Sequence, residues 1–334
     1  MRILRSILLA LSLLWYPMTS PAQTAHGLLL VANKGEHTLS IFDPDSGQQL
    51  ASVPVGGITG HEVAASPDGK TAWVPIYGNS GVGLPGTDGT TISVIDLNAR
   101  KQTGTIDLAK PSRPHCAVFN PKDGKLYVTT EITQSLTVID PARNAIVGTV
   151  PTGAQESHML AISSDGKRGY TANVGPGTVS VIDLQKKEVL ARIDVAKKIQ
   201  RIAISQDDRW VFTADQAKPE LAVIDTQTNT VKTRIPLAAS GYGMAATYDG
   251  KWLLVALPGS NSVSLIDLKT MKVEKTISVP AAPQEILIRP DDRVAYVSCD
   301  QSKQVVAIDL GTFKVTKTFN AGAGADGLAW AGRP

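Results

Sequence analysis

The sequence is poor in cysteine, in aromatic residues and in charge of one sign. Its 334 residues include two cysteines, Cys116 and Cys299, and 5% aromatic residues. Two cysteines far apart in the chain cannot form the disulfide framework of many small secreted domains. The formal net charge is +3, which does not predict the basic surface that nucleic-acid binding requires. We therefore expect a core held by apolar burial, with two free thiols and no nucleic-acid partner.

Short catalytic and cofactor motifs are also missing. The chain contains no G-x-S-x-G, H-E-x-x-H, C-x-x-C or C-x-x-C-H sequence. This excludes the nucleophile elbow of many serine hydrolases, the zinc helix of metalloproteases and the attachment site of covalently bound haem. Any chemistry must come from residues that the fold brings together.

Long apolar runs are absent as well. The stretch from Ile7 to Trp15 is too short to span a bilayer, and no later segment approaches that length. It follows two arginines and precedes the small residues Ser20 and Ala22. This pattern is typical of a signal peptide, which we place at residues 1–22. We expect a periplasmic or secreted protein without membrane insertion, with one domain over residues 23–334.

A repeat occupies the rest of the chain. From the second onward, the aspartates of a recurring turn are spaced 42 residues apart; they lie at Asp68, Asp123, Asp165, Asp207, Asp249 and Asp291. An apolar strand that ends in aspartate recurs seven times, at Asp43, Asp96, Asp140, Asp183, Asp225, Asp267 and Asp309. Because these aspartates recur in every unit, we interpret them as turn caps.

Each repeat contains four short segments of β-prone residues separated by turns. Four strands per unit of about 42 residues are typical of a β-propeller blade. The sequence therefore predicts an all-β, seven-bladed β-propeller of four-stranded antiparallel blades. The run at 28–33 lacks an inner strand before it, whereas the run at 326–331 is an inner strand with nothing after it. We expect these N- and C-terminal strands to pair in one blade and close the ring.

Three units carry a family resemblance. The sequences SPDGKTAWVPIYG, SSDGKRGYTANVG and TYDGKWLLVALPG are each followed by a strand similar to SVIDL. They resemble the YVTN-family seven-bladed β-propeller repeat proteins of secreted bacterial and archaeal type, over residues 28–331. The resemblance implies the fold and an extracytoplasmic location, but no single activity, because that fold carries many functions.

One blade departs from the repeat by an insertion. The turn and strand-end aspartates of a blade are 17 or 18 residues apart, but Asp68 and Asp96 are 28 apart. The extra residues lie in the glycine-rich segment 77–91, whose composition favours an irregular or mobile loop. By analogy with other propellers, we expect this insertion to lie over the central channel.

The inner strands supply the main functional signal. Each inner-strand motif has an equivalent position five residues before its last residue. We expect this position to lie at the mouth of the central channel, and we call it the mouth slot. It holds His61, His115, His158, Gln200, Tyr242, Gln284 and Asp326. The chain has only five histidines, yet three of them occupy this slot in consecutive blades. Because propeller symmetry directs equivalent side chains toward the axis, the three imidazoles should lie close together.

Three neutral imidazoles form one face of a metal coordination shell. We therefore expect His61, His115 and His158 to bind a transition metal such as zinc, copper, nickel or iron. Two other interpretations stay open. The histidines could cap the inner strands by bonding loop carbonyls and channel water, or they could contact a small ligand or haem directly.

Further residues near the mouth complete the prediction. Glu131 ends a second strand and is our candidate general base, whereas Glu62 should point between blades. We expect the remaining mouth residues to bind ligand; they are Gln200, Arg201, Tyr242, Gln284 and Asp326.

Three functions compete on this evidence. The first is a monomeric extracytoplasmic protein that binds a metal ion or small molecule through the three-histidine rim. The second is a metal-dependent hydrolase, lactonase or lyase that uses the same site. The third is a scaffold for a protein partner, in which the histidines are incidental.

Overall fold

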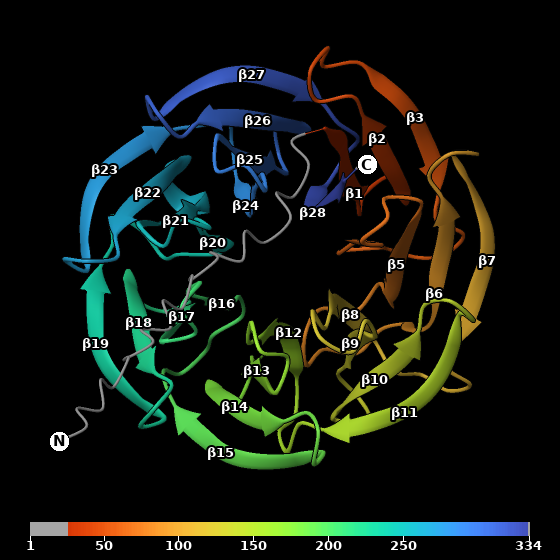
Figure 1. The fold of residues 1–334 in the computed structure, drawn as a ribbon, viewed down its shortest axis with the longest axis horizontal. Helices are drawn as coiled ribbons and strands as arrows, with labels where there is room; N and C mark the ends of the chain where they lie inside the picture. Colours follow the sequence, from red (N-terminus) through yellow and green to blue (C-terminus); the bar gives the residue numbers. More distant parts are fainter. Residues whose placement is uncertain (1–25, 333–334) are drawn as a thin grey trace, which may run out of the picture.

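The computed structural model describes residues 26–332, which form a ring of seven antiparallel four-stranded sheets (Figure 1). This confirms the predicted propeller. Residues 1–22, the predicted signal peptide, lie outside the described residues. Within the described chain, no helix is long and apolar enough to cross a membrane.

Blade one closes the ring. It contains, from the axis outward, β28 (Ala325–Gly332), β1 (Gly27–Asn33), β2 (Thr38–Phe42) and β3 (Gln49–Pro54). β1 and β28 pair antiparallel along almost their whole length and lie side by side in Figure 1. The predicted pairing of N- and C-terminal strands is therefore confirmed.

The other six blades each use four consecutive strands. Their inner strands are β4 (Ala64–Ala65), β8 (Pro114–Phe119), β12 (Ser157–Ile162), β16 (Ala203–Ile204), β20 (Met244–Ala246) and β24 (Pro283–Ile288). Their second strands are β5 (Thr71–Gly78), β9 (Leu126–Thr130), β13 (Arg168–Asn173), β17 (Trp210–Ala214), β21 (Trp252–Leu257) and β25 (Val294–Cys299).

The third and outer strands complete these blades. The third strands are β6 (Asp88–Asp96), β10 (Ser135–Asp140), β14 (Thr178–Asp183), β18 (Glu220–Asp225), β22 (Ser262–Asp267) and β26 (Gln304–Asp309). The outer strands are β7 (Lys101–Asp107), β11 (Ala145–Pro151), β15 (Glu188–Asp194), β19 (Thr230–Pro236), β23 (Lys272–Ser278) and β27 (Lys314–Asn320). A 3-10 turn, η1 (Pro258–Ser260), follows β21.

The core lies between the blades. Second and third strands are buried on both faces, as Leu254 in β21 and Val306 in β26 illustrate at 0% exposure. Outer strands are exposed except near their ends, where each buries one apolar side chain such as Ile106 or Ile193. Burying a side chain of this size contributes about 1.5–3 kcal/mol. Both cysteines are buried and free, as predicted.

The recurring aspartates cap turns. Asp165 accepts hydrogen bonds from the Ser163 hydroxyl at 2.6 Å and from the Lys167 amide at 3.0 Å. Gly166 follows it at φ +68°, a left-handed conformation that favours glycine. Asp183, at the end of β14, accepts from two amides of the next turn. The repeated carboxylates therefore act structurally and are spread around the ring.

The insertion is partly regular. It extends β5 to eight residues and β6 to nine, with the loop 79–87 between them. The Asn79 amide donates to the Thr87 carbonyl at 3.0 Å, and the Thr87 amide donates to the Asn79 side chain at 2.7 Å. These two hydrogen bonds close the base of the loop, and residues 79–87 themselves form only turns and bends.

Candidate functional site

The structure brings the three mouth-slot histidines together. His115 lies in β8, His158 in β12, and His61 just before β4. The ring centroids of His61 and His115 are 5.1 Å apart, and those of His115 and His158 are 3.5 Å apart. The imidazoles form a row across three consecutive blades, which we call the histidine cluster.

Tyr77 packs against the whole histidine cluster. Its ring centroid lies 5.2 Å from that of His61, 5.3 Å from His115 and 5.9 Å from His158. All three contacts are edge-on, with interplanar angles of 73° to 89°. Tyr77 is the first residue of the insertion, so the insertion begins by covering the histidine cluster.

Glu131 lies behind His158. One carboxylate oxygen is 2.7 Å from His158 Nδ1, and the other accepts a hydrogen bond from the Tyr77 hydroxyl at 2.7 Å. Arg113 Nη1 is 3.9 Å from that second oxygen. Glu131 is only 4% exposed, so it is a buried carboxylate with both oxygens engaged. Its place favours orienting His158, and a role as general base stays a prediction.

Burial and hydrogen bonding define the state of His158. Burial lowers the pKa of His158, and the Glu131 carboxylate offsets that effect only in part. The ring is therefore neutral near pH 7, with Nδ1–H donating to Glu131. Its other nitrogen, Nε2, lies 3.2 Å from the Gln200 amide nitrogen, which can donate to it. Nε2 is consequently the nitrogen that carries the lone pair.

His115 is the most buried of the three. It is 1% exposed, and its Nδ1 has no hydrogen-bond partner among the described residues. Burial, together with the neighbouring His158 and His61, holds the pKa of His115 well below its usual value. A neutral imidazole with a buried, unpaired nitrogen is unusual, because such groups normally find a partner.

His61 also has a carboxylate on Nδ1. Asp326 Oδ2 lies 3.2 Å from it, and Asp326 belongs to the inner strand of the neighbouring blade one. Two of the three histidines thus contact a carboxylate through Nδ1, each from a different blade.

Arg201 lies inside the channel. Its guanidinium pairs with Glu62 and Glu285 through Nη1 and with Asp326 through Nη2 at 2.9 Å. It is 2% exposed, and the Tyr242 ring lies 4.8 Å from it. We call this group the arginine cluster. It places Glu62 in the channel, so our expectation that Glu62 points between blades was wrong.

The arginine cluster shifts its carboxyl groups in opposite directions. Burial raises the pKa of Glu62 to about 8 and that of Glu285 to about 7, although Arg201 opposes both shifts. Burial would also raise the pKa of Asp326, but Arg201, His61 and Lys34 outweigh it and leave that pKa low. Glu62 and Glu285, which have no positive neighbour besides Arg201, therefore retain protons near neutral pH.

The other predicted ligand-binding residues occupy the rim. Gln200 contacts His158, and the Gln284 amide donates to the Ala282 carbonyl at 3.3 Å. Gln200, Gln284 and Tyr242 are each partly exposed at the mouth. They are the rim residues that a ligand could reach, whereas Arg201 and Asp326 are buried and already paired.

Sequence reasoning missed a second ring of site residues. In each blade, one residue directly follows the last paired residue of the second strand, as Glu131 does after the Thr130–Ser135 pair. Lys34 and Asp300 occupy the same position in their blades. Tyr77 occupies it in blade two, where the insertion continues the pairing of β5 past Tyr77 to Gly78. Lys34 Nζ contacts Asp300 at 2.9 Å and Asp326 at 3.1 Å. Aligning Glu131 with its equivalents would have identified all of them.

The insertion is fixed over blades three and four. Arg113 Nε donates to Asp88 at 2.6 Å, and its Nη2 donates to the Leu84 carbonyl at 2.6 Å. Beneath the loop is a cavity of about 210 Å³, whose lining includes Gly83, Arg113 and Glu131. The insertion thus covers the side of the mouth where Glu131 and His158 lie.

The histidine cluster is not arranged as a metal centre in this structure. Within residues 26–332, no group of three or more His, Cys, Asp or Glu side chains is placed to hold a metal ion. The rings of His115 and His158 lie close together and are tilted by 32°, so binding of one ion by both would require the rings to turn.

Comparison with known proteins gives the family and the fold. A sequence family described as YNCE-like beta-propeller matches residues 69–332. No curated protein matches the chain by sequence.

Among solved structures, the Kuenenia stuttgartiensis hydrazine synthase superposes with a TM-score of 0.73 at 17% identity, covering 88% of this chain and 99% of that one. A functionally unknown protein from Desulfotomaculum acetoxidans DSM 771 gives 0.75 at 14% identity, covering 92% and 100%. The dihydro-heme d1 dehydrogenase NirN in complex with DHE gives 0.64 at 16% identity, covering 95% and 77%. Identities this low show a shared propeller fold alone.

Proposed function

This chain belongs to the YNCE-like beta-propeller family, and we propose that it is an extracytoplasmic binding protein whose histidine cluster binds a transition-metal ion. The family gives the fold, whereas the site must supply the function. The predicted signal peptide at residues 1–22 supports the extracytoplasmic location.

The observation that supports metal binding is the pair of carboxylates behind the histidines. Asp326 and Glu131 contact Nδ1 of His61 and His158. Metal-ligating histidines usually donate their second ring N–H to a carboxylate, which fixes the tautomer and raises the basicity of the ligating nitrogen. This leaves Nε2 of the neutral His158 ring as the nitrogen with a lone pair, and His61 makes the same Nδ1 contact.

The donor set favours a borderline metal. Three neutral imidazoles suit zinc, copper, nickel or iron(II), and the site offers no group of free carboxylates for calcium or magnesium. Binding would require the Gln200 amide to leave His158 Nε2 and the rings of the histidine cluster to turn toward one point. Gln200 is partly exposed, so this movement needs no opening of the core.

The same geometry favours binding over catalysis. Both Glu131 oxygens are engaged, by His158 and by Tyr77, and the carboxylate lies behind the imidazole instead of facing the mouth. A hydrolase, lactonase or lyase that used a bound metal would need a different base. The scaffold function predicts no metal at all.

The test is metal content of the untagged protein after dialysis against zinc, copper, nickel or iron(II). We expect about one ion per chain in the wild type, and loss of that ion in the triple variant His61→Ala, His115→Ala, His158→Ala. We also expect Glu131→Gln to weaken the affinity by about 10–100-fold, because it removes the carboxylate that orients His158.

The matched control is His37→Asn. His37 lies outside the histidine cluster and has φ +57°, a conformation that asparagine tolerates. This variant should keep its metal. Wild-type protein that takes up none of the four metals, or a triple variant that binds them equally well, would show that the histidine cluster is not a metal site.

A further inference from the structure

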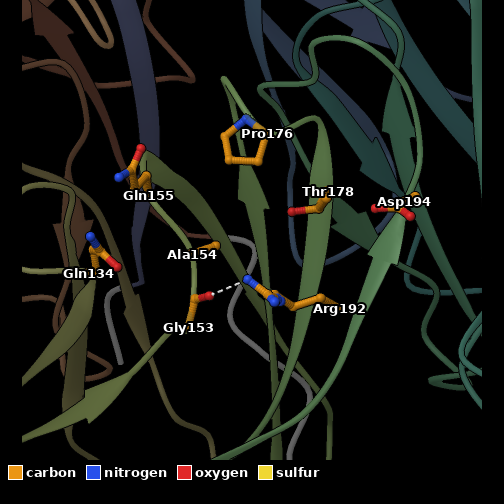
Figure 2. A pocket seen from close by; sticks show the side chains of 8 residues that line it. All are labelled: Gln134, Gly153, Ala154, Gln155, Pro176, Thr178, Arg192 and Asp194. Atoms are coloured by element: carbon orange, nitrogen blue, oxygen red, sulfur yellow. Dashed lines mark hydrogen bonds between the residues drawn. The ribbon is translucent and has the colours of Figure 1, made fainter.

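A second cavity of the described chain lies away from the histidine cluster. It has a volume of about 820 Å³ and opens between blades three and four. Figure 2 shows its walls: Gln134, Gly153 and Gln155 lie on one side and Thr178 and Asp194 on the other, with Arg192 reaching between them. We call it the blade-four cavity. Its size is that of a small-molecule site.

Arg192 brings an unneutralised positive charge to this cavity. Its Nη1 donates to the Gly153 carbonyl at 3.0 Å, which holds the side chain across the cavity. Among residues 26–332 it forms no ion pair, and its Nε and Nη2 have no hydrogen-bond acceptor. The guanidinium is therefore positioned but still has donors available in the fork geometry that binds carboxylates.

Asp194 brings an unneutralised negative charge. It lies two residues after Arg192 in β15, so both side chains leave the same face of the strand, with Cα atoms about 7 Å apart. In the part of the chain that the structure describes, the Asp194 carboxylate has no hydrogen bond or ion pair, and it does not contact Arg192. The two opposite charges thus line one cavity without neutralising each other.

Blade four alone combines these two residues. In the other six blades, the position equivalent to Arg192 holds Ser52, Thr105, Thr149, Arg234, Thr276 and Thr318. Of these, Arg234 is neutralised by Glu220 at 3.1 Å. Asp107 is the equivalent of Asp194 in blade two, and it caps its own turn by accepting from the Ala109 amide. The repeat itself therefore does not require Arg192 and Asp194.

We propose that the blade-four cavity binds a free α-amino acid in its zwitterionic form. The ligand carboxylate pairs with the Arg192 guanidinium, and its ammonium group pairs with the Asp194 carboxylate. Arg192 and Asp194 are both exposed on the outer strand β15, so a ligand can reach both groups, whereas a simple anion or cation would pair with only one of them. Gln134, Gln155 and Thr178 also line the cavity, and their polar side chains favour a polar ligand side chain.

The test is calorimetric titration of the full mature chain with each of the free protein amino acids. At least one polar amino acid should bind, and Arg192→Thr and Asp194→Asn should each weaken that binding at least ten-fold. Threonine occupies the Arg192 position in four other blades, so this variant should fold. The matched control, Arg234→Thr in blade five, should bind like the wild type.

Blocked ligands separate the two charges. The N-acetyl derivative and the amide of the best amino acid each lack one charge, and both should bind at least ten-fold more weakly. Equal binding of either blocked form, unchanged binding by Arg192→Thr, or no binding of any free amino acid up to about 10 mM would each overturn the proposal. Metal content of the histidine cluster should be the same in all these variants, so this test is independent of the proposed metal site.

Discussion

At the scale of single residues, the arginine cluster concentrates buried charge in the channel. Arg201 carries one positive charge, and three carboxyl groups surround it. A buried charge without compensation is costly, so the excess negative charge must be reduced. The raised pKa values of Glu62 and Glu285, about 8 and about 7, show that proton retention performs this role.

Stability should therefore fall as pH rises through the range in which Glu285 loses its proton. Its pKa is about 7 in the folded protein and 4.5 as the unperturbed value. Between these values the folded state binds more protons than the unfolded state, so the free energy of unfolding decreases with pH and levels off above about 7. We expect Glu285→Gln to remove up to about 3 kcal/mol of this loss.

Urea denaturation of wild type and variant at pH 5, 6, 7 and 8 measures this effect. The two proteins should be similar in stability at pH 5 and diverge toward pH 8, with the variant more stable. Glu274→Gln, an exposed substitution on β23, is the matched control and should follow the wild type. Parallel curves for Glu285→Gln and wild type would show that this carboxyl ionises normally.

The sequence predicted the position of the histidines but not their partners. The repeat register was enough to align His61, His115 and His158, because equivalent backbone positions repeat around the axis. The carboxylates on their Nδ1 atoms come from other blades, and such contacts depend on side-chain conformations that no pattern encodes. Arg201 and Glu62 both directly follow a mouth-slot residue, so the repeat register shows that they are equivalent, but the alternation of strand side chains pointed away from the channel and concealed their contact.

At the scale of secondary-structure elements, neighbouring blades are joined through their turns. Asp208 lies in the turn before β17. Both of its carboxylate oxygens accept from the Ser164 amide, and Oδ2 also accepts from the Ser164 hydroxyl, which links blade five to blade four. Asp292 binds two amides of blade six in the same way. The turns of four other blades have glycine at this position, at Gly69, Gly124, Gly166 and Gly250.

Asp208→Gly should remove the link between blades without straining the turn. Asp208 has φ +57°, and glycine adopts this conformation freely. The loss of charge-assisted hydrogen bonds should lower the free energy of unfolding by about 2 kcal/mol, partly offset by the relief of backbone strain. Asp208→Asn keeps one acceptor oxygen and should lie between wild type and glycine variant. A glycine variant as stable as the wild type would mean that the link contributes nothing net.

The turn pattern also explains why the fold was predictable. The aspartates cap the turns and the glycines adopt their left-handed backbone conformation, so both residue types recur once in most blades. Their spacing of 42 residues therefore indicated the size of a blade. The insertion was less predictable. Its glycines suggested an irregular loop, but the hydrogen bonds of Arg113 to Asp88 and Leu84 come from a residue 25 or more positions away.

At the scale of the whole molecule, stability depends on closure of the ring. A closed propeller leaves only short, protected strand edges. Here β28 from the C-terminus supplies the inner strand of the blade that β1 to β3 begin. It also carries Asp326, which contacts Arg201, Lys34 and His61. β28 therefore completes a sheet and packs against the two neighbouring blades. It also supplies the carboxylate that pairs with the positive charges of Arg201 and Lys34.

Truncation after Ala325 should consequently destabilise the entire ring. It exposes the backbone groups of β1 that pair with β28, uncovers apolar side chains such as Leu29 and Leu30, which are fully buried, and removes one carboxylate from Arg201. We expect a loss of more than about 5 kcal/mol, which is comparable to the whole stability of many domains. Thermal unfolding followed by circular dichroism should show a lower midpoint and a broader transition.

Two further variants separate strand closure from charge. Truncation after Gly332 removes the last two residues and leaves all of β28, so its melting temperature should match that of the full chain. Asp326→Asn in the full chain removes the carboxylate but keeps the strand, and should cost less than the long truncation. If Asp326→Asn were as destabilising as the loss of β28, the channel charges rather than the closing strand would hold the ring together. A long truncation with an unchanged melting temperature would show that six complete blades and an open seventh are sufficient.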